Sequence, residues 1–145
     1  VGSEMCIRDR YTHGHIVDFV ESLKVNPNLL TILGDGNQFK SYFHVDDCIN
    51  AMLLLGNKLG KEILGFMPIN LGTEEGITVY ESAKIISDTL NLKPKFKFTG
   101  GKQGWIGDNP IIQLDISRAK DLGWRPTFSI STCIRDTANW VYKNF

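Results

Sequence analysis

A single lysine follows a glycine-rich turn, in a setting that suits anion binding. The stretch reads ILGDGNQFKSYFHVDD, and Lys40 comes just after the turn cluster at residues 34–37. An ammonium group held between strands donates a charge-assisted hydrogen bond to an anion with little ordering cost. We expect the β-favouring runs 29–33 and 41–45 to pair as a hairpin, with a loop longer than two residues, and so to hold Lys40.

Two other arrangements have the spacing of catalytic pairs but are better explained by structure. Asp46 and Asp47 are adjacent, and adjacent helical residues do not face each other, so we interpret one of them as the N-cap of a helix over about residues 48–55. Tyr80 and Lys84 have the Tyr-x-x-x-Lys spacing, but they lie inside an expected amphipathic helix. We therefore predict no catalytic residue in this chain.

The cysteines and histidines do not indicate a metal site or a disulfide framework. The sequence has three of each, widely spaced and without a CxxC pair: Cys6, Cys48, Cys133, His13, His15 and His44. A His-x-His pair without a nearby carboxylate or third ligand is weak evidence for a metal. We predict unpaired thiols in a reducing compartment, and hence a cytoplasmic location.

Composition excludes several classes of function. The 145 residues are 42% hydrophobic and 22% charged, as in an ordinary soluble domain. The formal net charge is zero, which argues against a general binder of nucleic acid or of anionic membranes. No apolar run approaches the roughly 20 residues that span a bilayer. We therefore expect neither nucleic acid nor membrane as a partner.

The elements that must position these residues are read from hydrophobic periodicity and capping signals. The pattern predicts a mixed α/β domain without a full run of βαβ units, and no glycine fingerprint for a dinucleotide follows its first strand. In the first half of the chain we expect a helix within 11–27, strands at 29–33 and 41–45, a helix at 48–55 and a strand at 68–71.

In the second half we expect a helix at 79–90 opened by a Thr78–Glu81 capping box, a strand at 95–98, a loop at 100–110 and a strand at 111–114. A short helix follows, capped by Asp115 or Ser117 and closed by Gly123. The last helix is capped by Ser129, and its core face consists of Ile130, Cys133, Ile134, Ala138 and Val141.

The first ten residues do not fit this pattern. VGSEMCIRDR has no helical or strand periodicity, and it lacks the apolar region of a signal peptide. It resembles a recurring translation artefact in environmental sequence data. We expect residues 1–10 to be a leader outside the fold, residues 11–145 to form the domain, and the chain to begin in the middle of a larger protein.

From about residue 11 to residue 145 the chain resembles the C-terminal, substrate-binding part of extended short-chain dehydrogenase/reductases. Within that family it is most similar to the nucleotide-sugar epimerases and dehydratases typified by UDP-glucose 4-epimerase. The segments that carry the resemblance are LLTILGDGNQFKSYFHVDDCINAM, INLGTEEGITVYESAKIIS and GDNPIIQLDISRAKDLGWRPTFS. The resemblance implies a small mixed α/β substrate domain, with most of the Rossmann domain of such an enzyme missing.

The resemblance also implies a set of residues that bind a nucleotide-diphosphate sugar. Lys40 stands where the family usually has an arginine on the diphosphate, and the base lies along the preceding strand. A second arginine is usual upstream of the Gly-Asp motif, where this chain has lysine and glutamine instead. The implied substrate-binding residues are Thr31, Leu33, Gln38, Lys40, Lys102, Gln103 and Asp108, the last beside the ribose.

The implied activity belongs to a longer protein, a homodimer that uses NAD or NADP. In the family the cofactor takes a hydride from a sugar carbon, and a tyrosine–lysine pair in the upstream domain moves the proton. We expect this chain alone to bind no cofactor and to be inactive. Two alternatives stay open: a non-catalytic nucleotide-sugar-binding module, and a nucleotide-sugar reductase or decarboxylase of the same family. The sugar, the base and the choice of cofactor stay open as well.

Overall fold

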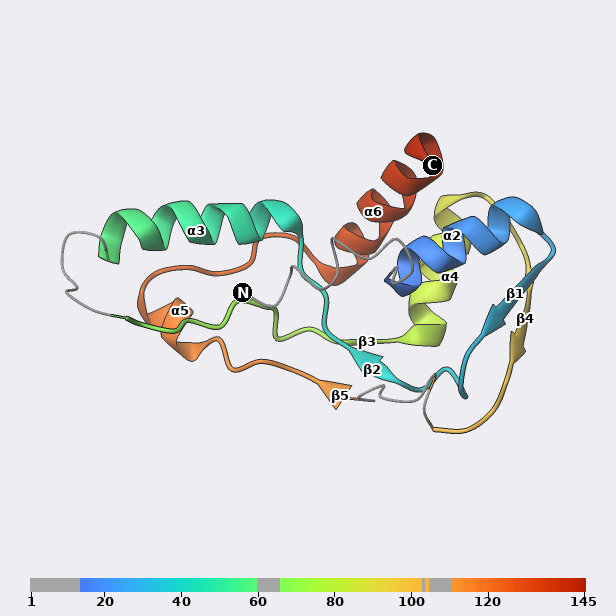
Figure 1. The fold of residues 1–145 in the computed structure, drawn as a ribbon, viewed down its shortest axis with the longest axis horizontal. Coiled ribbons are helices and arrows are strands. Elements are labelled where there is room, and N and C mark those ends of the chain that lie inside the picture. The colour runs from blue at the N-terminus through green and yellow to red at the C-terminus, as the bar shows by residue number, and fades with distance from the viewer. Residues whose placement is uncertain (1–13, 60–65, 103, 105–110) are drawn as a thin grey trace.

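The computed structural model describes residues 14–59, 66–102, 104 and 111–145, and its fold is mixed α/β, as predicted. The expected leader lies outside these residues. In chain order the elements are α2 (His15–Val25), β1 (Leu29–Ile32), β2 (Phe39–Lys40), α3 (Val45–Leu59), β3 (Ile77–Thr78), α4 (Val79–Thr89), β4 (Lys95–Phe98), β5 (Ile111–Ile112), α5 (Ser117–Asp121) and α6 (Ile130–Asn144). Figure 1 shows α3 and α5 towards one end, and α2, α4, α6, β1 and β4 towards the other.

The strands form two small sheets, and the expected hairpin between residues 29–33 and 41–45 is wrong. Instead, β1 pairs in parallel with β4, so that Leu29 lies opposite Lys95. The second strand is Phe39–Lys40 rather than 41–45, and it pairs antiparallel with β3 and parallel with β5. The buried residues of β1, Leu30 and Ile32, face the helices, and its partner β4 alternates lysine and phenylalanine in sequence.

Three further expectations need correction. Residues 68–71 are not a strand; Ile69 and Leu71 pack into the apolar cluster beside α3. The strand expected at 111–114 covers two residues only. Helix α3 is longer than the expected 48–55, beginning at Val45, and neither aspartate precedes it as the N-cap. The His44 Nδ1 instead accepts the hydrogen bond from the backbone N–H of Asp46, at 3.1 Å.

The helices with strong local signals form as predicted. Thr78 and Glu81 make a full capping box at the start of α4. Ser129 accepts from the Thr132 N–H at the start of α6, and every residue predicted for the core face of α6 is buried. Helices α2, α4 and α6 contact one another, and they pack around β1 to form the larger of two apolar clusters.

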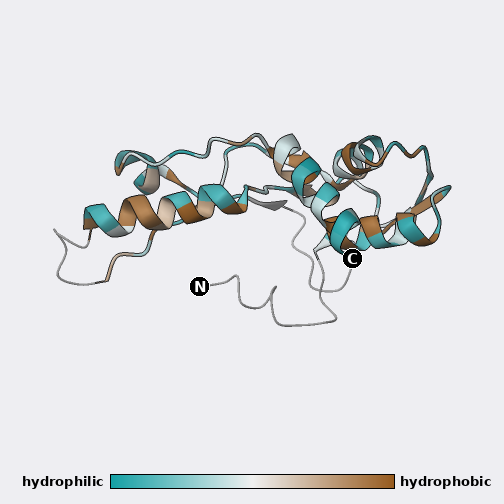
Figure 2. Ribbon diagram, turned by 90° about the horizontal axis from the view of Figure 1, so that it is seen from above, coloured by the Kyte–Doolittle hydropathy of each residue, from teal (hydrophilic) through white to brown (hydrophobic). Residues whose placement is uncertain are grey.

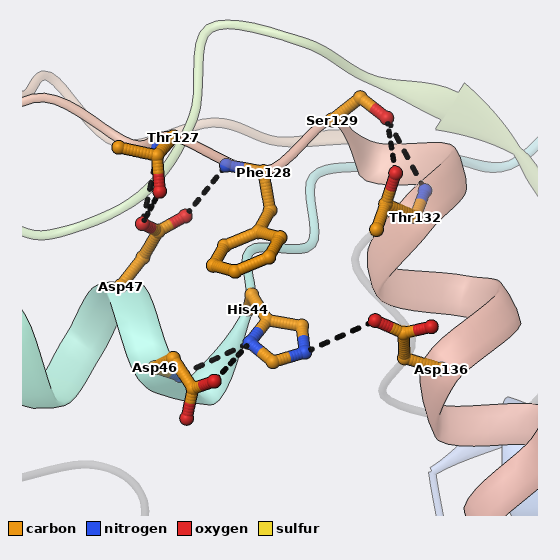
Figure 3. Close-up of polar contacts among 8 residues, drawn as sticks. All are labelled: His44, Asp46, Asp47, Thr127, Phe128, Ser129, Thr132 and Asp136. Carbon is orange, nitrogen blue, oxygen red and sulfur yellow. Dashed lines mark hydrogen bonds and ion pairs between the residues drawn. The ribbon is translucent and has the colours of Figure 1, made fainter.

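A buried carboxylate joins α3 to the chain leading into α6. Asp47, which is 1% exposed, accepts hydrogen bonds from the Thr127 backbone (3.0 Å), the Thr127 hydroxyl (2.7 Å) and the Phe128 backbone (3.1 Å). Burial alone would raise the pKa of Asp47, but these hydrogen bonds outweigh it and leave the pKa lowered. Figure 3 shows the same junction, with the His44 ring stacked on Phe128 and directed at Asp136 of α6.

One face of α3 is apolar and exposed. Val45, Ile49, Met52 and Leu53 recur at helical spacing and are all exposed, and Figure 2 shows the hydrophobic turns along this helix. Exposed patches of this kind mark interaction surfaces or promote self-association.

We expect the isolated chain to self-associate through this face of α3. Replacing both Ile49 and Leu53 by lysine should lower the average mass in sedimentation velocity, because charge disfavours apolar contact. Asn50→Lys adds one such charge at an exposed, polar position of α3 and should leave the mass unchanged. A parent chain that sediments as a compact monomer would contradict this prediction.

Candidate functional site

A cavity of about 590 Å³ lies between α2, β1, β2 and the start of α4. Its volume falls in the usual range for small-molecule sites. Four of the residues predicted from the sequence line it together: Thr31, Leu33, Gln38 and Lys40. Lys102 is exposed and does not line the cavity, while Gln103 and Asp108 lie outside the described residues.

The alternation of β1 explains why two of these side chains reach the cavity. Leu30 and Ile32 point into the helical core, so Thr31 and Leu33 point to the other face of the strand. Leu33 is accordingly exposed although it is apolar. The apolar side chain of Leu33 and the hydroxyl of Thr31 on this face suit contact with the ring system of a ligand.

The segment 34–38 leads from β1 into β2, and hydrogen bonds fix both its ends. At the β4 side, the Gly34 N–H donates to the Thr99 hydroxyl at 2.8 Å, and the Gly100 N–H donates to the Gly34 carbonyl at 2.9 Å. These bonds hold the first part of the segment against the end of β4.

At the other side, the same segment caps a helix. The Val79 N–H donates to the Gln38 carbonyl, and the Tyr80 N–H donates to the Gly36 carbonyl, both at 3.0 Å. The first N–H groups of a helix have no partner within it, so these bonds satisfy α4 while they fix the segment. Gly36 has φ +81°, and a Cβ there would lie 2.6 Å from Cε1 of Phe98.

Lys40 is therefore held by a sheet, but not by the hairpin that the sequence predicted. Its backbone lies in β2, opposite Ile77 of β3 on one side and Ile112 of β5 on the other. The side chain is half-buried and lines the cavity. A central strand position limits the freedom that a lysine loses when it binds an anion.

His15, at the start of α2, is a residue of the cavity that sequence reasoning missed. Its Nε2 lies 2.7 Å from the buried Ser82 hydroxyl, and its ring stacks on Tyr42 with centroids 5.0 Å apart. Burial, followed by the positive charge of Lys40, lowers the pKa of His15 to about 4. The imidazole is neutral at pH 7. From the sequence, His15 is notable only as part of the His-x-His pair with His13.

The described residues contain no group of three or more histidines, cysteines, aspartates or glutamates that could hold a metal ion. Burial, then the negative charge of Asp47, raises the pKa of Cys133 to about 11, which makes this thiol a poor nucleophile. No helix in the described part of the chain is long and apolar enough to cross a membrane.

A scan against models of known protein families found no match. Among curated proteins, UDP-glucuronic acid decarboxylase 4 of Arabidopsis thaliana is 30% identical over 89% of this chain and 27% of its own length. A putative UDP-glucose 4-epimerase of Methanocaldococcus jannaschii is 29% identical over 90% of this chain and 40% of its own length. The chain thus spans well under half of the curated relatives that it matches.

Solved structures of similar fold agree with the sequence relatives. A crystal structure of UDP-galactose 4-epimerase matches 94% of this chain with a TM-score of 0.80 and 31% identity. UDP-glucose 4-epimerase of Thermotoga maritima, solved with UDP-glucose, matches 94% with a TM-score of 0.74 and 27% identity. The match covers 42% of each of these two chains.

Gly36→Ala should lower the free energy of unfolding by about 1–3 kcal/mol, because the new Cβ adopts a left-handed conformation and meets Phe98. Gly100→Ala is the matched control: it has the same φ of +81° but open space around the Cβ, so it should cost less. Urea denaturation measures both. Equal losses at the two positions would show that the contact with Phe98 carries no cost.

His15 should make stability fall on mild acidification. The folded pKa of about 4 is below the unfolded value of about 6.5, so the unfolded chain binds more protons between these values. Its contribution is complete above pH 6.5 and is lost as the pH falls towards 4. Between pH 7.5 and 5.0 the parent should lose about 2 kcal/mol more than His15→Gln, which cannot titrate. Parallel pH curves for the two proteins in urea denaturation would contradict this.

Proposed function

Since the chain matches the extended short-chain dehydrogenase/reductase family of nucleotide-sugar epimerases, dehydratases and decarboxylases in both sequence and fold, we propose that residues 11–145 form the nucleotide-sugar-binding domain of such an enzyme. The observation that carries the proposal is the cavity itself. In this cavity a cationic side chain, Lys40, lies together with the polar side chains of Thr31 and Gln38 and the apolar side chain of Leu33, so that one ligand can contact all four.

The electrostatics of the cavity support a diphosphate at Lys40. A nucleotide-diphosphate sugar carries its charge on two adjacent phosphates, and a lysine ammonium is a common partner for phosphate. His15 stays neutral beside it, because burial and the charge of Lys40 both disfavour a second cation. The Thermotoga maritima enzyme of similar fold was solved with UDP-glucose.

The nucleoside then lies along β1. Thr31 and Leu33 share the face of this strand that lines the cavity, and Leu33 offers an apolar surface to a base. Gly104 also lines the cavity, and it lies two positions after Lys102 in the chain. We assign a second phosphate contact to Lys102 or Gln103, and a ribose contact to Asp108.

The chemistry belongs to a longer protein in this proposal. Structures of the same fold were solved with NAD and with NADPH, and such a cofactor supplies hydride transfer at a sugar carbon. This chain has no glycine fingerprint for it, so its own residues bind and orient the nucleotide-sugar. We place the cofactor site and the tyrosine–lysine pair outside these 145 residues, in a cytoplasmic homodimer.

Epimerisation is the reaction favoured first, because two epimerases match this fold with TM-scores of 0.80 and 0.74. Decarboxylation is the second candidate, favoured by a decarboxylase that is 30% identical over 89% of the chain. Both reactions begin with oxidation of the sugar, so the proposed binding residues are compatible with either.

Lys40→Ala should weaken binding of UDP-glucose or GDP-mannose by about ten- to a hundredfold, the loss of one charge-assisted hydrogen bond. Lys40→Arg should keep or improve binding, because a planar fork suits phosphate oxygens. Lys143→Ala removes a lysine at the far end of α6 and should change nothing. Isothermal titration calorimetry measures all four proteins. Equal affinity of the parent and Lys40→Ala would remove Lys40 from the site.

A further inference from the structure

The side-chain amide of Gln38 uses only one of its two ends. Nε2 donates to the backbone carbonyl of Leu33 at 3.0 Å. A carbonyl oxygen can only accept a hydrogen bond, so the end of the amide that faces it must be the N–H end, and the other end is the oxygen. The other end, Oε1, has no hydrogen-bond partner among the described residues.

This acceptor is buried as well as unpartnered. Gln38 is 3% exposed, and it is one of the residues that line the cavity. Native proteins satisfy nearly all their buried polar groups, and an exception calls for an explanation, such as a ligand that supplies the missing partner. The backbone of segment 34–38 is fixed at both ends, and the bond from Nε2 to the Leu33 carbonyl holds the amide itself, so turning Oε1 towards water would break that bond.

The position of Gln38 selects the part of the ligand that supplies the donor. In the proposed function, the base lies beside Thr31 and Leu33 and the diphosphate lies at Lys40. Gln38 lies between Leu33 and Lys40 in the chain, and it is bonded to the carbonyl of Leu33. The part of a nucleotide between base and diphosphate is the ribose, whose hydroxyl groups are donors.

We propose that Gln38 Oε1 accepts a hydrogen bond from a ribose hydroxyl of the bound nucleotide, so that the site selects ribonucleotides over their deoxy forms. This inference rests on the proposed function. A neutral amide is a suitable acceptor for this hydroxyl. A carboxylate in its place would pair with the nearby Lys40 and compete with the phosphates. A site built to accept a hydroxyl proton rejects a ligand that lacks it, because the acceptor is then left unpaired.

The test uses the full 145-residue chain and calorimetric titration. UDP and GDP are compared first, and the tighter ligand is then compared with its 2′-deoxy, 3′-deoxy and base-N-methylated forms. We expect one deoxy form to bind about three- to tenfold more weakly, as one neutral hydrogen bond implies. The base-methylated form should bind like the parent nucleotide. Loss with the methylated form alone would overturn the inference and assign Oε1 to the base.

Two variants separate reading of the hydroxyl from a purely structural role. Gln38→Met keeps the size of the side chain and removes the acceptor, so it should bind the ribo form and the deoxy form that the parent disfavours equally. Gln38→Glu keeps an acceptor and should still prefer the ribo form, even with lower affinity overall. If Gln38→Met weakens all ligands by the same factor and keeps the preference, the residue is structural and the inference is wrong.

The two levels of the proposal fail in different ways. If the parent binds a nucleotide but treats its ribo and deoxy forms alike, the inference about Gln38 is wrong and the proposed function stands. If the parent binds neither UDP nor GDP at millimolar concentration, the proposed function is wrong, and the inference is wrong with it.

Discussion

The two backbone carbonyls that accept from the first N–H groups of α4 are the constraint on which the rest of the site depends. Gly36 and Gln38 supply them, in the segment that leaves one sheet and enters the other. Without these bonds the helix would lose part of its N-terminal capping, and the segment would lose its fixed path. A single set of interactions therefore orders α4, joins the two sheets and sets one wall of the cavity.

In the same wall, His15 adds no second positive charge beside Lys40. Lys40 lies in β2, and the neighbouring imidazole of His15 is kept neutral first by burial, against Phe19, Tyr42 and Ser82, and then by the charge of Lys40. The two groups are coupled, because the charge of Lys40 helps to lower the pKa of His15.

Features that depend on residues close together in the chain were predicted correctly from the sequence. The capping box of Thr78 and Glu81 and the apolar face of α6 involve residues within a few turns of one another, and both are confirmed. Strand pairing was mispredicted, because the partner of β1 is not the next strand but β4, far along the chain. Asp47 illustrates the same limit: its position suits a helix cap, yet its carboxylate bonds residues 127 and 128. The turn and the resemblance single out Lys40 as a diphosphate contact, which stays a prediction, whereas the place of His15 in the cavity depends on Ser82, a contact with no sequence signature.

The parallel pairing of β1 with β4 has a consequence for how the chain comes to be folded. Leu29 and its partner Lys95 are separated by 66 positions (95 − 29), and Asp47 is separated from Thr127 by 80 positions. At a synthesis rate of roughly 5–20 residues per second, β1 leaves the ribosome about 3–13 s before its partner is made. Throughout that interval the unpaired edge of β1 is open to other chains. Because a long loop closes slowly, the sheet of β1 and β4 forms late in the folding of this chain.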